Sequence, residues 1–218
     1  MYYKNRAEAG RQLAQQLKKY NSKNISVVAL SPGGLIIGAQ IAMALHSHLV
    51  LLLMKETDEF SVVSSAVFNS SLSNFSYNDM YTPGQVEELA GHRIPLIQQK
   101  ILSHTNHRHT LLGKIGEVNH DLLRRKILIV VSDGFPTGYS LRELLSYISD
   151  VQVKKVIVVS PVASVDAVDV MHGYADEIHC PSVTENFISV NHYYNDNTIP
   201  PAEDMFKVTK NIALQWKL

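Results

Sequence analysis

The sequence has 218 residues, a length that suits one compact domain with an insertion better than two average domains. Its 20 Lys and Arg residues balance 20 Asp and Glu residues, which argues against a nucleic-acid or anionic-membrane surface as the partner. Cys180 is the only cysteine, so an intramolecular disulfide is excluded and a reducing compartment is favoured. With no apolar run near the ~20 residues of a membrane span and no secretory signal, we expect a cytoplasmic protein.

The first part of the chain predicts a helix followed by a β-α-β unit. Apolar residues recur at helical spacing over 3–20, the pattern of an amphipathic helix. The run 25–30 is apolar and β-branched, as in a strand covered on both faces of a parallel sheet. A Ser-Pro-Gly-Gly turn at 31–34 separates this strand from a helix over 35–45. The next apolar run, 49–54, predicts a second buried strand.

The middle of the chain is less regular, and its Ser- and Asn-rich stretches interrupt the alternation. We interpret about 58–119 as an insertion or hood within a single domain that spans 1–218. Regular alternation returns after residue 124. Strands are expected at 127–131, 156–159 and 177–180, and helices at 141–148, 165–174 and 202–215. Together the elements predict an α/β fold with a doubly wound, mainly parallel sheet flanked by helices.

The junction 132–140, between a buried strand and a helix, carries residues suited to binding a phosphate. Gly134 and Gly138 let a ligand approach the backbone closely, and the N–H groups at a helix start favour an anion. Thr137 and Ser140 add hydroxyl donors beside them. The carboxyl ends of parallel strands are where open α/β sheets bind ligands, so we expect a phosphorylated small molecule here.

Asp133, in the same junction, is a poor partner for the phosphate itself because like charges repel. Its carboxylate suits sugar hydroxyls or a Mg²⁺ ion, which prefers oxygen ligands. The residues of the junction leave both partners open for Asp133.

This junction resembles the signature of the type I phosphoribosyltransferases, in which a strand precedes two acids, three variable residues and Thr-Gly-x-Thr/Ser. The matching residues are Asp133, Thr137, Gly138 and Ser140. The resemblance implies that 136–140 wraps the 5-phosphate of phosphoribosyl pyrophosphate, with Mg²⁺ on the diphosphate side. It implies a catalytic role at the ribose, and an indirect contact with the metal, for Asp133. The other substrate-binding residues that it implies in this junction are Ser132, Gly134, Phe135, Pro136, Thr137, Gly138, Tyr139 and Ser140.

Further stretches are similar to one uncharacterised branch of that family and cover nearly the whole chain. They are 6–14, 29–34, 158–163, 175–178, and Phe187 with Tyr193 and Tyr194. Within 29–34, the resemblance identifies Ser31, Pro32, Gly33 and Gly34 as the diphosphate-binding loop. It also favours a homodimer.

Two departures from the family pattern weaken the case for catalysis. Ser132 replaces the first of the two acids, and Pro32 stands where the branch typically has an arginine. The loop thus loses a cation that would neutralise the leaving diphosphate, although Lys55, after the second strand, could supply one. A carboxylate that serves as general base in some members is Pro136 here.

Two hypotheses follow from this pattern. One is a phosphoribosyltransferase that moves phosphoribose from phosphoribosyl pyrophosphate to a nitrogenous acceptor and releases diphosphate. The alternative is a non-catalytic module that senses a phosphoribosyl compound or nucleotide after losing part of the diphosphate and ribose site.

Overall fold

The computed structural model describes residues 2–21, 23–52, 120–199, 201 and 204, and the backbone of three short strands at 54–56, 67–69 and 74–76. The chain divides into two compact units, of which one comprises Met1–Leu53 and Val118–Leu218, and the other Met54–Glu117. Most of the hood expected at about 58–119 lies outside the described residues. The assignment of 1–218 as a single domain therefore stays a prediction.

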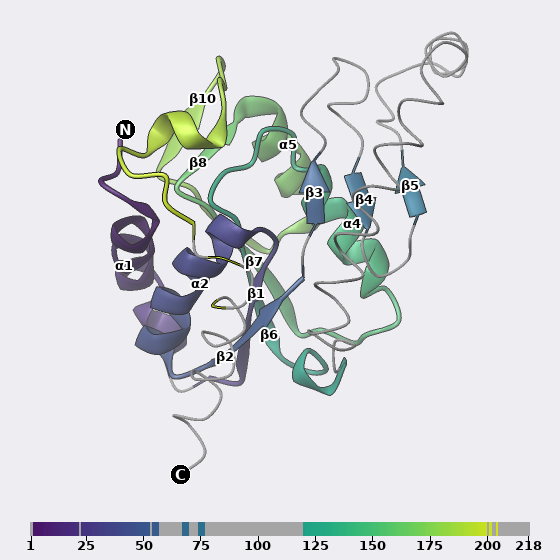
Figure 1. The fold of residues 1–218 in the computed structure, drawn as a ribbon. Helices are drawn as coiled ribbons and strands as arrows, with labels where there is room; N and C mark the ends of the chain where they lie inside the picture. Colours follow the sequence, from purple (N-terminus) through teal and green to yellow (C-terminus); the bar gives the residue numbers. More distant parts are fainter. Residues whose placement is uncertain are drawn as a thin grey trace, which may run out of the picture. The chain divides into compact units, whose positions relative to one another are not determined.

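A five-stranded sheet forms the centre of the first unit (Figure 1). Its strands lie in the order β2-β1-β6-β7-β9, and every neighbouring pair is parallel. Their bounds are β1 Ile25–Ala29, β2 His48–Leu51, β6 Ile127–Val131, β7 Lys155–Val159 and β9 Glu177–His179. All residues of β1 and β6 are buried, as expected from sequences that are apolar except for Ser26. The predicted parallel sheet is confirmed.

Helices lie on both sides of this sheet, with α1 and α2 on one side and α4 and α5 on the other (Figure 1). Their bounds are α1 Arg6–Gln16, α2 Pro32–Leu45, α4 Tyr139–Tyr147 and α5 Val165–Tyr174. A short 3₁₀ helix, Lys18–Tyr20, follows α1. The arrangement confirms the predicted doubly wound α/β architecture.

Smaller elements complete the description. In the first unit, β8 (Val162–Ser164) and β10 (Ser182–Thr184) form a separate two-stranded parallel sheet that the sequence did not predict. Two more 3₁₀ helices cover His120–Leu122 and Val190–Tyr193. In the second unit, β3 (Met54–Glu56), β4 (Val67–Asn69) and β5 (Asn74–Ser76) form an antiparallel sheet. The helix predicted at 202–215 lies outside the described residues except for Asp204.

Several predicted boundaries differ from those in the structure. The segment 31–34 is not a separate turn, because α2 begins at Pro32 with Ser31 as its N-cap. Proline suits this first helical position since the missing N–H would have no partner inside the helix. The strand predicted at 49–54 ends at Leu51, where its partner β1 also ends at Ala29.

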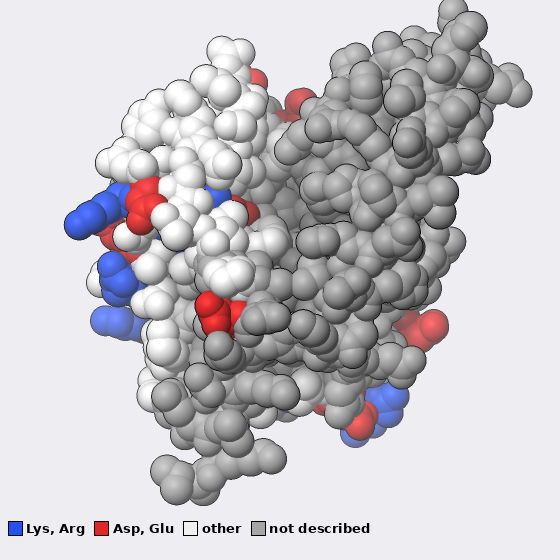
Figure 2. All heavy atoms as spheres, viewed as in Figure 1, with Lys and Arg blue, Asp and Glu red and all other residues white. Residues whose placement is uncertain are grey.

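Figure 2 shows Lys and Arg side chains near Asp and Glu side chains, interspersed with uncharged residues, on the face in view. This mixture agrees with the balanced charge of the sequence. Within the described part of the chain, no helix has both the length and the apolar character needed to cross a membrane.

Candidate functional site

The start of the junction 132–140 is held by the segment that connects β7 to α5. Ser132 N donates to Val159 O at 3.3 Å, and Phe135 N donates to Val162 O at 3.1 Å. In return, Ser164 N donates to Phe135 O at 2.9 Å. The Phe135 side chain is fully buried. These contacts fix the backbone that leads to α4, so Phe135 anchors the site from the core.

The end of the junction forms an open helix start. Gly138 is the N-cap of α4 in the left-handed conformation, with φ of 74°, and it gives the helix no side-chain cap. A Cβ on Gly138 would lie 3.1 Å from Ala167 O, so glycine is required both by conformation and by space. Ser164 Oγ holds Pro136 by donating to its carbonyl oxygen at 2.6 Å. Backbone N–H groups at such a helix start suit an anion.

Three residues with hydroxyl groups, Thr137, Tyr139 and Ser140, lie at this helix start. Tyr139 N donates to Thr137 Oγ1 over a long 3.5 Å, and both residues are half-buried. Ser140 lies in the first turn of α4 and is buried. The structure thus brings together, at one helix start, the hydroxyl groups that the sequence assigned to phosphate binding.

The segment 31–34 meets the first junction directly. Ser31 Oγ accepts from Gly34 N at 2.8 Å and donates to Asp133 Oδ1 at 2.6 Å. A Cβ on Gly33 would overlap with the Asp133 carboxylate, and one on Gly34 would lie 2.9 Å from Val131 O. The two glycines therefore permit close packing of α2 against the end of β6. The predicted diphosphate-binding and phosphate-binding segments lie side by side.

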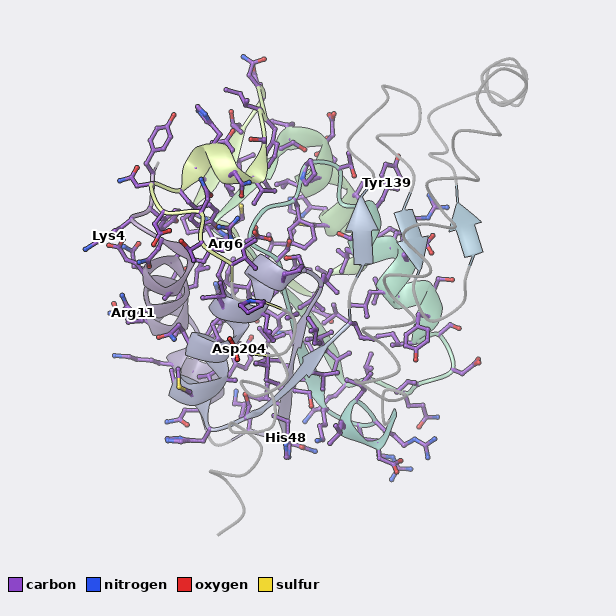
Figure 3. All side chains as sticks on the ribbon, viewed as in Figure 1. Lys4, Arg6, Arg11, His48, Tyr139 and Asp204 are labelled. Atoms are coloured by element: carbon purple, nitrogen blue, oxygen red, sulfur yellow. The ribbon has the colours of Figure 1, made fainter. Side chains whose placement is uncertain are left out.

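Arg6, at the start of α1, forms a buried ion pair with Asp133. Arg6 Nε lies 2.8 Å from Asp133 Oδ2, with side-chain exposures of 2% and 8%. Arg6 also donates to Asn191 Oδ1 at 2.7 Å and to Asn197 Oδ1 at 3.4 Å, and its guanidinium lies over the Tyr194 ring at 4.5 Å from the centroid. Figure 3 shows Arg6 inside the molecule, whereas Lys4 and Arg11 extend outward from the same region.

Sequence reasoning missed this residue as part of the site. Arg6 lies three, four and seven positions before Ala9, Gly10 and Leu13, which are among the buried residues of α1. A charged residue on the apolar face of an amphipathic helix needs a buried partner. That spacing was the signal that could have identified Arg6.

The segment around the 3₁₀ helix Val190–Tyr193 covers the same junction. Tyr194 Oη donates to Asp133 O at 2.6 Å, and burial, with the Asp133 charge as a smaller cause, raises the pKa of Tyr194 far above its ordinary value. A Cβ on Gly134 would lie 3.0 Å from Val190 and 3.4 Å from Phe187. Phe187 and Tyr194 therefore pack against the site, and Tyr194 helps to fix the Asp133 backbone.

The described residues do not offer Mg²⁺ a direct protein site. Both Asp133 oxygens already accept hydrogen bonds, one of them from a guanidinium, whose positive charge opposes a second cation. Within the described part of the chain, no group of three or more His, Cys, Asp or Glu side chains could hold a metal ion. For Lys55 only the backbone, in the second unit, is described, so its suggested role stays a prediction.

Comparison with known proteins places the chain in a sequence and fold context. No family model matches the chain. Two proteins of Mycobacterium tuberculosis, from the strains CDC 1551 and H37Rv, are each 25% identical to it over 199 residues and bear the name "Putative phosphoribosyl transferase". The match covers 90% of this chain but 44% of each relative, so the chain spans less than half of their length.

A solved structure shows the same fold. The crystal structure of TT1426 from Thermus thermophilus matches with a TM-score of 0.67 and 21% identity, and the match covers 99% of both chains. The sequence relatives and the parallel sheet flanked by helices agree with the resemblance drawn from 132–140. The chain is thus similar in sequence to two proteins named as putative phosphoribosyl transferases, and it shares the fold of TT1426.

Proposed function

We propose that the chain binds phosphoribosyl pyrophosphate, with the 5-phosphate at 136–140, and transfers phosphoribose to a nitrogenous acceptor with release of diphosphate. The observation that carries this proposal is the start of α4, where the N-cap Gly138 is in the left-handed conformation and has no side chain with which to cap the first turn. Thr137 and Ser140, which both carry hydroxyl groups, flank Gly138 and Tyr139 in the sequence of this helix start. Such a helix start can bind a phosphate through several donors at once.

Asp133 and the segment 31–34 serve the ribose and diphosphate in this proposal. A carboxylate has about four lone-pair positions, and Arg6 and Ser31 take two of them. The others can accept hydrogen bonds from ribose hydroxyls. Because the two segments are in contact, a ligand held at 136–140 could extend toward the start of α2. Catalysis would then rest on positioning and on stabilising a positively charged sugar.

The proposed reaction also requires that the acceptor lose a proton. Pro136 cannot act as a general base, so the proton of the nitrogenous acceptor would leave through the substrate or through a group outside this junction. In this proposal Mg²⁺ would bind with the diphosphate, whose own oxygens are suitable ligands.

The second candidate function is a non-catalytic sensor of a phosphoribosyl compound or nucleotide. The Arg6–Asp133 pair favours it, because the acid available for the ribose is already compensated inside the protein. Ser132 points the same way, since its hydroxyl donates to Gly134 O at 2.9 Å within the junction. This function keeps the phosphate site and omits the transfer.

We further propose that the protein acts in the cytoplasm as a homodimer. Cys180 is a free thiol, which is easiest to maintain in a reducing compartment. Exposed apolar side chains on the first unit, including Tyr2 and Met43, supply surface for a second copy. Light scattering of the purified chain would test the dimer.

Calorimetric titration of phosphoribosyl pyrophosphate and of ribose 5-phosphate, with and without Mg²⁺, tests the function. We expect both ligands to bind, and Thr137→Ala to weaken each by about tenfold or more, since a hydrogen bond to a charged group contributes roughly 1.5–3 kcal/mol. Ser146→Ala, which removes an exposed hydroxyl from the other end of α4, should leave both affinities unchanged.

The pattern of affinities separates the two candidate functions. Tighter, Mg²⁺-dependent binding of phosphoribosyl pyrophosphate supports the transferase and justifies a screen of nitrogenous acceptors. Equal binding of the two ligands favours the sensor, because the diphosphate then contributes nothing. If neither ligand binds, the phosphate site itself is wrong.

A further inference from the structure

We propose that Arg6 is a positioning residue of this site, whose charge cancels that of Asp133 and thereby allows a doubly charged phosphate to bind at 132–140. The inference rests on the phosphate site proposed above. It assigns a role to a residue of α1, the first helix of the chain, which lies 127 positions away from its partner.

Asp133 places a negative charge in the junction that is proposed to bind a phosphate. Its carboxylate belongs to the same nine-residue junction as the proposed phosphate site, three positions before Pro136. Asp133 is 6% exposed, so water screens its charge little, and an uncompensated carboxylate there would repel a phosphate over a short distance. A site that keeps this acid needs a cation close to it.

Arg6 meets this requirement by its geometry. Its guanidinium, which stays protonated in proteins, contacts Asp133 Oδ2 from the side of α1 and α2. Gly33 makes room for the pair, since any Cβ at that position would overlap with both Asp133 and Arg6 Nε. Asn191, Asn197 and the Tyr194 ring hold the rest of the guanidinium. The cation is thus fixed behind the carboxylate and need not touch the ligand.

Stability alone is a weak reason for such a pair. Taking two charges out of water costs about as much as their attraction returns, and well-packed apolar residues often stabilise a protein as much or more. The pair does, however, give the junction an acid for sugar hydroxyls without a net negative charge beside the phosphate. This combination suits a ligand that carries both groups.

The test measures the affinity for inorganic phosphate, a probe without a ribose, in four variants. Arg6→Gln should weaken binding by about threefold to tenfold, and Asp133→Asn, which leaves the Arg6 charge uncompensated, should strengthen it by a similar factor. The double variant Arg6→Gln/Asp133→Asn and the charge-conserving variant Arg6→Lys should both bind nearly as well as the native chain. Each sample is first checked for its fold by circular dichroism and urea unfolding.

The phosphate affinity of the Asp133→Asn variant distinguishes a role of Arg6 through its charge from a role in packing alone. If Arg6 only supports the fold, removing its partner leaves phosphate affinity unchanged or lowers it, and either result overturns the proposal. Arg6→Gln leaves a buried carboxylate unpaired and Asp133→Asn leaves a buried guanidinium unpaired, so the fold check applies to both. The double variant removes both charges and carries neither defect. If the native chain binds neither phosphate nor phosphoribosyl pyrophosphate, the proposed function fails as well. If it binds phosphate without the expected order of variants, the role of Arg6 alone is wrong.

Discussion

Two strand-to-helix junctions of the first unit, from β1 to α2 and from β6 to α4, differ in how their helices begin. Both follow neighbouring parallel strands and both contain glycines. The α2 junction is closed, because Ser31 caps the helix and also donates to Asp133. The α4 junction is open, because Gly138 brings no cap to its helix. The glycines of the α2 junction allow close contacts within the protein, whereas Gly138 in the α4 junction adopts a left-handed backbone conformation.

This difference bears on where an anion can bind. At the α2 junction, Gly34 N already donates to Ser31 Oγ and Leu35 N to Ser31 O. The carboxylate of Asp133 stands beside them, so an acid of the protein occupies the place where a ligand anion would be favoured. We infer that the α4 junction carries most of the phosphate affinity and the α2 junction contributes less.

The largest expected loss of stability comes from a substitution in the closed α2 junction. Gly33→Ala places a Cβ too close to Asp133 Oδ2 and Arg6 Nε, so both side chains must shift, and we expect the buried ion pair to break. Breaking such a pair costs about 3–5 kcal/mol. Urea unfolding followed by circular dichroism would measure the loss of free energy of unfolding.

Gly173→Ala is the matched control for this substitution. Gly173 lies near the end of α5, and a Cβ there would meet nothing within 4 Å. Because alanine favours a helix over glycine, the control should stabilise the protein by roughly 0.5–1 kcal/mol. Equal effects of the two substitutions would mean that the Arg6–Asp133 contact does not depend on Gly33.

The next effect tests the open junction. Gly138→Ala forces alanine into the left-handed region and brings its Cβ to 3.1 Å from Ala167 O. We expect a loss of about 1–3 kcal/mol in unfolding free energy, together with weaker binding of ribose 5-phosphate because the N–H groups of α4 shift. Calorimetry on the folded variant separates the two losses. Full ligand affinity in this variant would contradict the assignment of phosphate to this junction.

The sequence predicted the sheet and its helices because their signals are local. The run 127–131 is an unbroken apolar stretch and 25–30 is interrupted only by Ser26, a pattern typical of short strands covered on both faces. The helix expected at 165–174 matches α5. The start of α2 was misjudged, because Ser-Pro-Gly-Gly is typical both of a turn and of a capped helix start.

The site was only partly predictable, because its key contacts join residues far apart in the chain. The junction 132–140 has a distinctive local sequence, and the structure brings its residues together as a helix start. That Arg6 would pair with Asp133, or that Gly33 would make room for this pair, depends on how α1 packs near α2. No local pattern contains that information.

A smaller loss of stability is expected from Ser31→Ala. Comparing this variant with Thr137→Ala separates the contribution of each junction to stability from its contribution to binding. Ser31→Ala removes both the cap of α2 and the hydrogen bond to Asp133, so it should cost about 1–2 kcal/mol in unfolding free energy. Its affinity for ribose 5-phosphate should stay close to that of the native chain. Thr137→Ala should show the reverse, with little change in stability and a clear loss of affinity. Identical behaviour of the two variants would show that the junctions do not differ in function.

The smallest effect on stability is expected from an ion-pair cluster outside both junctions. Its contribution to stability can be compared with that of the buried Arg6–Asp133 pair. Glu177 contacts Lys155 at 2.6 Å and Lys19 at 2.8 Å, and its side chain is 27% exposed. Hydrogen bonds from Lys155, then from Lys19, hold the pKa of Glu177 well below its usual range. Since solvent screens such pairs, Glu177→Gln should cost under about 1 kcal/mol at neutral pH.

The pH dependence of this small effect has a defined sign. A carboxyl whose pKa is lower in the folded than in the unfolded protein stabilises the fold above the unfolded value, near 4.3. The difference in unfolding free energy between the native chain and Glu177→Gln should therefore be constant at neutral pH and shrink as the pH falls below about 4. Thermal unfolding of both chains across this range measures it. A difference that grew on acidification, or one as large as that of Gly33→Ala, would contradict the view that burial makes the Arg6–Asp133 pair the more sensitive of the two.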